Sequence, residues 1–172
     1  MDDAFKMGIK VAICSTSNEA AVTTIARTLL GGERLSKIKI FAGDVVAKKK
    51  PAPDVYLLAA SSLEVSPERC WVVEDSEIGL KAAKAAGMRC VVTKSVYTQL
   101  EDFASADVTI QDLDKGLDGP ITTLYLDYKA SPTAFKPLKA TDNSDLFSAN
   151  DRSVAIFSKI AKGEMGKGGF PF

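Results

Sequence analysis

Three groups of polar residues suited to phosphate chemistry follow apolar, strand-like runs in this chain of 172 residues. They are Ser15-Thr16-Ser17-Asn18 after Lys10–Cys14, Lys50 at the head of Lys50-Pro51-Ala52-Pro53-Asp54, and Glu74-Asp75 after Cys70–Val73. A phosphoryl group in transfer needs hydrogen-bond donors, a cation to balance its charge, and usually a divalent metal. Hydroxyls, an ammonium and a carboxylate pair offer these three functions. The carboxylates are hard oxygen ligands of the kind that Mg²⁺ prefers.

Apolar runs alternate with helical patterns from Ile9 to Ile110, which predicts a parallel α/β arrangement. Expected strands are Lys10–Cys14, Ile38–Phe41, Cys70–Val73, Arg89–Thr93 and Asp107–Ile110, and expected helices are Asn18–Leu30, Asp54–Leu63 and Glu77–Ala86. The first helix carries apolar residues at helical spacing and should end at Gly31-Gly32. Thr16 and Glu19 have capping-box spacing at its start.

All three polar groups come after expected strands, and ligands of parallel α/β sheets bind beyond the carboxyl ends of the strands. We therefore expect one common crevice. Ser15 would offer its hydroxyl to the phosphate, together with the amides of Thr16 and Ser17 at the helix N-terminus. Lys50 precedes a proline and should be held on a stiff, extended segment. Glu74 and Asp75 would bind the metal.

Each group also has a plainer interpretation when taken alone. Ser15 to Asn18 are typical helix-capping residues. Lys50 could be a solvated lysine, as we expect Lys48 and Lys49 to be. Glu74-Asp75 could be the polar end of a strand. We expect Tyr56 and Trp71 to belong to the core because both lie in apolar-periodic segments.

Composition narrows the class of protein. Basic and acidic residues balance at 22 each, so the chain has no excess of positive charge that would bind nucleic acid or a membrane surface. We therefore expect its binding partner to be a small molecule. The chain has no histidine, so catalysis by imidazole and zinc sites built on histidine are excluded. No apolar stretch reaches the roughly 20 residues that span a bilayer. Three cysteines in apolar runs favour a soluble protein of a reducing compartment.

The order and spacing of these groups resemble the haloacid dehalogenase-like hydrolases. The resemblance runs from Gly8 to Val108, with Val11 to Asn18 similar to the second motif, Lys50 to Asp54 to the third, and Val72 to Ser76 with Gly79 to the fourth. It implies a Rossmann-like core, Mg²⁺, and phosphatase chemistry through an aspartyl-phosphate. Ser15 and Lys50 would hold the phosphoryl group in this chemistry, and Glu74 and Asp75 the metal.

Further stretches of the sequence are similar to the CbbY-like branch of the family. This branch neighbours the β-phosphoglucomutases and includes a plastid phosphatase acting on xylulose-1,5-bisphosphate. The matching stretches are Cys14 to Glu19, Lys37 to Val46, and Val92 to Ser95 with Tyr97 and Thr98. This implies a sugar phosphate or bisphosphate as substrate, a monomer at full length, and the plastid stroma if the source is a photosynthetic eukaryote, otherwise the cytoplasm. A phosphosugar mutase and a non-catalytic phosphate-binding module stay open as alternatives.

The family's first motif, Asp-x-Asp with the nucleophile, has no counterpart before Ser15, and its helical cap has none either. We expect the chain alone to be inactive. The family's first strand lies between the strands ending at Cys14 and Val73, so we expect an incomplete sheet with two unpaired inner edges. Asp112-Leu113-Asp114 would serve as the motif only in a permuted chain.

Two regions are expected along the chain. Residues 1–128 would form the C-terminal part of the hydrolase core, and residues 129–172 a polar, flexible extension. Within the extension, Val154, Phe157 and Ala161 fall at helical spacing and predict one short helix.

Overall fold

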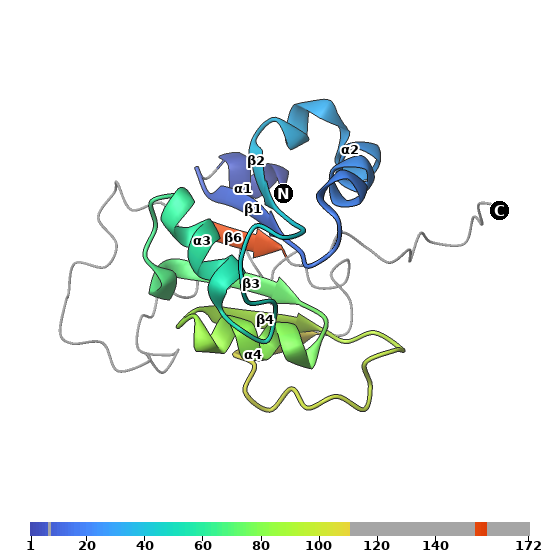
Figure 1. The fold of residues 1–172 in the computed structure, drawn as a ribbon, viewed down its shortest axis with the longest axis vertical. Coiled ribbons are helices and arrows are strands. Elements are labelled where there is room, and N and C mark those ends of the chain that lie inside the picture. Colours follow the sequence, from blue (N-terminus) through green and yellow to red (C-terminus); the bar gives the residue numbers. More distant parts are fainter. Residues whose placement is uncertain (7, 111–153, 158–172) are drawn as a thin grey trace, which may run out of the picture.

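The computed structural model describes residues 1–6 and 8–110, and the backbone of residues 154–157. A six-stranded sheet lies at its centre in the order β2-β1-β6-β3-β4-β5, with every neighbouring pair parallel (Figure 1). The strands are β1 Lys10–Cys14, β2 Ile38–Phe41, β3 Cys70–Glu74, β4 Arg89–Thr93, β5 Val108–Ile110 and β6 Val154–Phe157. The predicted Rossmann-like arrangement of parallel strands with flanking helices is confirmed.

Helices cover both faces of the sheet because successive side chains of each strand point to opposite sides. Val11 and Ile13 of β1 pack with α1 (Asp2–Lys6) and α2 (Glu19–Leu35) on one face. Ala12 and Cys14 pack with α3 (Asp54–Ser62) and α4 (Glu77–Ala85) on the other. A single 3₁₀ turn, Pro67–Arg69, leads into β3.

The start of α2 differs from the predicted capping box. Asn18 is the capping residue, and its side-chain oxygen accepts hydrogen bonds from the amides of Ala20 (3.0 Å) and Ala21 (3.2 Å). Asn18 stands directly before the first helical residue, Glu19, so its carboxamide reaches the amides two and three residues further on and takes the capping role expected of Thr16. The helix breaks near its predicted end, because Gly31 has φ +75°, but helical turns then continue to Leu35.

The prediction of a helix around Val154 and Phe157 is wrong, because these residues form the strand β6 in the middle of the sheet. Val154 is in register with Lys10 and Cys70, and Phe157 with Ile13 and Val73. The expected gap between β1 and β3 is therefore filled by a late segment of the same chain. Backbone groups on two facing edges require partners, and a parallel strand supplies both edges with hydrogen bonds at once.

Several expectations fall outside the described residues. They include the boundary between residues 128 and 129, the Asp112-Leu113-Asp114 segment and the helical position of Ala161. In the portion of the chain that is described, no helix combines the length and apolar character required to cross a bilayer.

Candidate functional site

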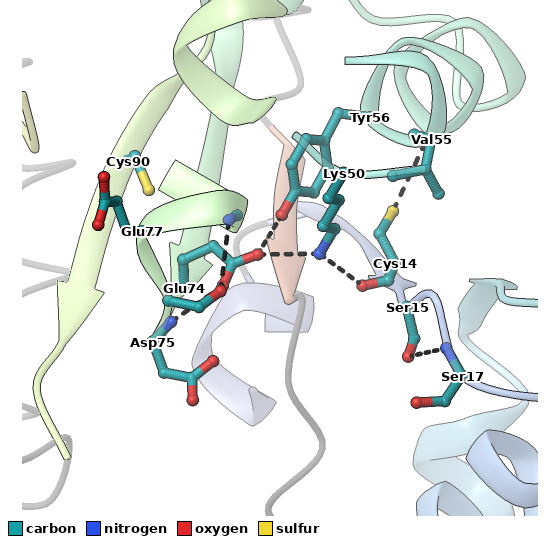
Figure 2. Close-up of polar contacts among 12 residues, drawn as sticks. Cys14, Ser15, Ser17, Lys50, Val55, Tyr56, Glu74, Asp75, Glu77 and Cys90 are labelled. Atoms are coloured by element: carbon teal, nitrogen blue, oxygen red, sulfur yellow. Dashed lines mark hydrogen bonds and ion pairs between the residues drawn. The ribbon is translucent and has the colours of Figure 1, made fainter. Parts of the chain in front are cut away.

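Lys50 lies between the carboxyl ends of β1 and β3, where the sequence placed the crevice (Figure 2). Its Nζ is 2.8 Å from Oε1 of Glu74 and 3.3 Å from the carbonyl oxygen of Cys14, and its side chain is 7% exposed. Cys14 is followed directly by Ser15. The ammonium therefore joins the hydroxyl loop to the acidic strand end, and Lys50 is not the solvated residue of the plainer interpretation.

Glu74 is the last residue of β3 and is 2% exposed. Its Oε1 accepts hydrogen bonds from Lys50 and from the Tyr56 hydroxyl (2.6 Å). Its Oε2 accepts from the Asp75 amide (3.0 Å) and the Ser76 hydroxyl (3.1 Å). Since each carboxylate oxygen offers two acceptor positions, these donors fill all four. The predicted metal ligand Glu74 thus serves first as the counterion of Lys50.

The hydroxyl loop between β1 and α2 is fixed by backbone hydrogen bonds. The Ser15 amide donates to the Phe41 carbonyl (2.9 Å), and the Gly43 amide donates to the Ser17 carbonyl (2.7 Å). The Ser17 amide, expected to face a ligand, donates to Oγ of Ser15 at 3.1 Å. Thr16 and Ser17 are exposed at the surface.

Asn18 is exposed, and its carboxamide oxygen is engaged in capping α2. The structure therefore supports the plainer interpretation of this residue. A phosphate contact from Asn18 would have to use its amide nitrogen.

Asp75 is half-buried, and Figure 2 shows its carboxylate directed away from that of Glu74. Within the described ranges, no group of three or more histidine, cysteine or acidic side chains is placed to hold a metal ion. A carboxylate with an outward orientation fits one position of a Mg²⁺ shell, which this ion otherwise fills with water and substrate oxygens. Asp75 can thus supply part of a magnesium site, whereas the oxygens of Glu74, also expected to bind the metal, are already occupied by hydrogen-bond donors.

Tyr56 is a part of the site that the sequence did not indicate, whereas Gly79 was named as part of the fourth motif but without a contact to Glu74. Tyr56 was expected in the core, and it is fully buried there, but its hydroxyl also reaches Glu74. The available signal was a phenol within an apolar helix, since a buried tyrosine usually finds a polar partner. Gly79 is in contact with the Glu74 carboxylate: a Cβ built on it would lie 1.8 Å from Oε1. Trp71 is half-buried, with the guanidinium of Arg89 5.3 Å from its ring centroid.

Lys49 is exposed, as expected, and is also bonded to the neighbouring loop. Its Nζ is 2.6 Å from Oδ1 of Asp44 and 2.7 Å from the Gly43 carbonyl. These residues line an open pocket of about 480 Å³ together with Thr16 and Asn18. The pocket lies directly beside the hydroxyl loop.

The three cysteines are buried and free. Burial raises the pKa of each thiol from 9.0 to about 12. For Cys14 and Cys90 the Glu74 carboxylate raises the pKa further, while Lys50 opposes this. A thiol that holds its proton so firmly is a poor nucleophile and metal ligand, which removes these residues from the candidates.

Comparison with known proteins agrees with the geometry. Residues 3–87 match the family model "haloacid dehalogenase-like hydrolase". A CBBY-like protein of Arabidopsis thaliana is 65% identical over 107 residues, which are 62% of this chain and 34% of that protein. Protein CbbY of Cereibacter sphaeroides is 43% identical over 106 residues, 61% of this chain and 46% of that protein.

Among solved structures, CbbY from Rhodobacter sphaeroides has been crystallised with phosphate and, as a mutant, with xylulose-(1,5)bisphosphate. Each superimposes with a TM-score of 0.62 at 42% identity, covering 64% of this chain and 50% of that one. The chain spans about half or less of the length of the relatives named here. With its sheet order, its lysine between two strand ends and these matches, the chain is similar to the haloacid dehalogenase-like hydrolases, and among them to CbbY-like proteins.

Proposed function

We propose that this chain forms the phosphate-holding part of a Mg²⁺-dependent phosphatase acting on a sugar phosphate or bisphosphate. The Ser15 hydroxyl and the Thr16 amide bind the nonbridging oxygens of the phosphoryl group, while the Ser17 amide, which donates to Oγ of Ser15, holds that hydroxyl in place. Lys50 balances the negative charge that these oxygens carry in transfer. The resemblance assigns attack on phosphorus to an aspartate of the first motif and an aspartyl-phosphate intermediate, and neither role falls to these residues.

One observation carries the proposal: a lysine ammonium is held nearly out of solvent between two strand ends, bonded to the carbonyl of Cys14, the residue directly before Ser15. A buried ammonium costs several kcal/mol to desolvate unless it is paired, and here Glu74 and the Cys14 carbonyl pair it. These two contacts use two of the three N–H donors of the ammonium, so one donor is left for a ligand. The same ammonium can therefore keep its contacts with Glu74 and Cys14 and donate a further hydrogen bond to a phosphate oxygen when substrate arrives.

Asp75 is the residue of this chain that we assign to Mg²⁺, with Glu74 behind it as the carboxylate that places Lys50. Bound Mg²⁺ would polarise the phosphoryl oxygens and neutralise part of their charge. The Asp75 amide donates to Glu74, so the backbone that carries the metal ligand is tied to the carboxylate that holds the lysine.

A bisphosphorylated sugar is the substrate class that we favour. CbbY, whose complex contains xylulose-(1,5)bisphosphate, shares 42% identity with this chain. The pocket of about 480 Å³ lined by Thr16, Asn18 and Lys49 lies next to the phosphate loop and offers room for the rest of such a molecule. If the source is a photosynthetic eukaryote, the same relatives favour the plastid stroma.

Calorimetric titration of the 172-residue chain with inorganic phosphate in the presence of Mg²⁺ tests the proposal. We expect saturable binding that Ser15→Ala weakens by about 10-fold, the value of roughly one hydrogen bond to a charged group. Ser61→Ala, an exposed serine of α3, is the matched control and should bind as the wild type does. Absence of saturable binding, or equal loss in both variants, would reject the assignment.

Product analysis separates the alternatives. Release of phosphate from sugar phosphates by the full-length protein indicates a phosphatase, whereas interconversion of glucose phosphates indicates a mutase. Phosphate binding without either reaction in the full-length protein indicates the non-catalytic module.

A further inference from the structure

Tyr56 contacts both members of the buried ion pair at the site. Its hydroxyl donates to Oε1 of Glu74 at 2.6 Å, and the Nζ of Lys50 lies 4.7 Å from the centroid of its ring. The side chain itself is fully buried on α3, against the sheet. Figure 2 shows the ring beside the lysine, with its hydroxyl turned toward the carboxylate. One side chain thus places a hydrogen-bond donor on the anion and an aromatic face against the cation.

The Glu74 carboxylate has little room to move from this position. On the α4 side it lies against Gly79, where even a Cβ would overlap its Cδ at 1.9 Å. The Ser76 hydroxyl donates to Oε2 and accepts from the Gly79 amide at 3.3 Å, which fixes the direction of its proton. On the α3 side the Tyr56 hydroxyl donates to Oε1 and restrains the carboxylate there. These contacts hold the carboxylate from two different helices.

We propose that Tyr56 is a positioning residue for phosphate binding. It holds the Glu74 carboxylate in place, and Glu74 in turn holds the Lys50 ammonium next to the Cys14 carbonyl, at the start of the hydroxyl loop. The inference rests on the proposed function and assigns to Tyr56 a role beyond core packing. A lysine side chain has four rotatable bonds and adopts a single position only when its partner is fixed. The Tyr56 hydroxyl and ring restrain both partners, so the ammonium is in place before the phosphate arrives.

Removal of the hydroxyl alone should show this role. Tyr56→Phe keeps the ring beside Lys50 but takes one donor from Glu74. The carboxylate then gains freedom, and the ammonium that follows it spends less time near the hydroxyl loop. We expect phosphate to bind about 3- to 10-fold more weakly, within the net contribution of one ordinary hydrogen bond, because the lost donor acts on the phosphate only through Glu74 and Lys50.

The test uses the full chain and two readouts. The first is the affinity for inorganic phosphate, and the second is the ¹H–¹⁵N signal of the Lys50 ammonium in the absence of phosphate, assigned with Lys50→Met. Tyr97→Phe, at a tyrosine that is 84% exposed, is the matched control and should alter neither. Tyr56→Phe should shift or broaden the ammonium signal and weaken phosphate binding together.

An unchanged ammonium signal in Tyr56→Phe overturns the inference, whatever happens to phosphate affinity, because the effect would not pass through Lys50. If the wild type binds no phosphate at all, the proposed function fails, while the ammonium signal still reports on positioning. If Tyr56→Phe does not fold, fluorotyrosine at position 56 is compared instead. Its more acidic hydroxyl should shift the ammonium signal of Lys50, and no shift would again overturn the inference.

Discussion

Gly79→Ala is expected to be strongly destabilising, although alanine normally stabilises a helix relative to glycine. Gly79 lies in α4, and a Cβ at this position would sit 1.8 Å from Oε1, 1.9 Å from Cδ and 2.3 Å from Oε2 of Glu74. These separations are far below van der Waals contact. Either α4 moves off the sheet or the carboxylate leaves its seat and loses the hydrogen bonds that hold it.

The magnitude follows from the burial of the pair. Lys50 and Glu74 are 7% and 2% exposed, so solvent does little to compensate separated charges. Disruption of a buried ion pair costs about 3–5 kcal/mol. The better helix propensity of alanine returns about 1 kcal/mol. We therefore expect the free energy of unfolding to fall by about 2–4 kcal/mol.

Denaturant unfolding of the full chain, followed by far-UV circular dichroism, measures the change. Gly32→Ala is the matched control, since Gly32 lies in α2 in helical conformation and a Cβ there would meet no atom within 4 Å. It should be neutral or stabilising by up to about 1 kcal/mol. Equal stability of Gly79→Ala and Gly32→Ala would refute the claim that Glu74 is confined against α4.

Three further predictions concern other parts of the fold. Because burial raises the thiol pKa values of Cys14, Cys70 and Cys90 to about 12, folded protein keeps protons that the unfolded chain releases near pH 9. The free energy of unfolding should thus be independent of the ionisation of these thiols below pH 9 and fall above it by up to about 1.4 kcal/mol per pH unit for each thiol. Denaturation curves from pH 8 to 10.5 with no such slope would contradict this. Val154→Cys should form a disulfide with Cys70, its partner in register, within one chain when the reduced, unfolded chain is refolded under oxidising conditions; its absence in non-reducing mass spectra would argue against β6. Lys39→Met removes an ammonium that caps the carboxyl end of α3 at 2.7 Å and should cost about 0.5–1 kcal/mol in unfolding experiments, while no change would show that the contact adds nothing.

Much of the fold could be predicted because its signals are local. The apolar runs that end at Cys14 and Val73 are short, β-branched and bounded by polar turns, and they lie in the sheet as expected, with β3 extending one residue further to Glu74. The strand β6 could not be predicted in this way. Its position depends on two distant edges that share a register, and the spacing of Val154 and Phe157 alone suits a helix equally well.

The site shows the same division between local and distant information. The order of the hydroxyl loop, Lys50 and the acidic pair predicted their meeting, because parallel strands end at one edge. The partners of Glu74 required the packing of α3 and α4 on the same face of the sheet. Asn18, named with the phosphate-binding loop, uses its side-chain oxygen to cap α2, a role that its position directly before the helix made available from the sequence.

The central claim is that the hydroxyl loop, Lys50 and Asp75 together form one site for a phosphate and its metal. Titration of ¹⁵N-labelled chain with inorganic phosphate, with and without Mg²⁺, tests it most directly by backbone and lysine-ammonium NMR. We expect saturable shifts confined to the Ser15–Ser17 amides, the Lys50 ammonium and the Asp75 amide, with tighter binding when Mg²⁺ is present. Shifts that do not saturate, or that centre elsewhere while the Lys50 signal stays fixed, would contradict the claim.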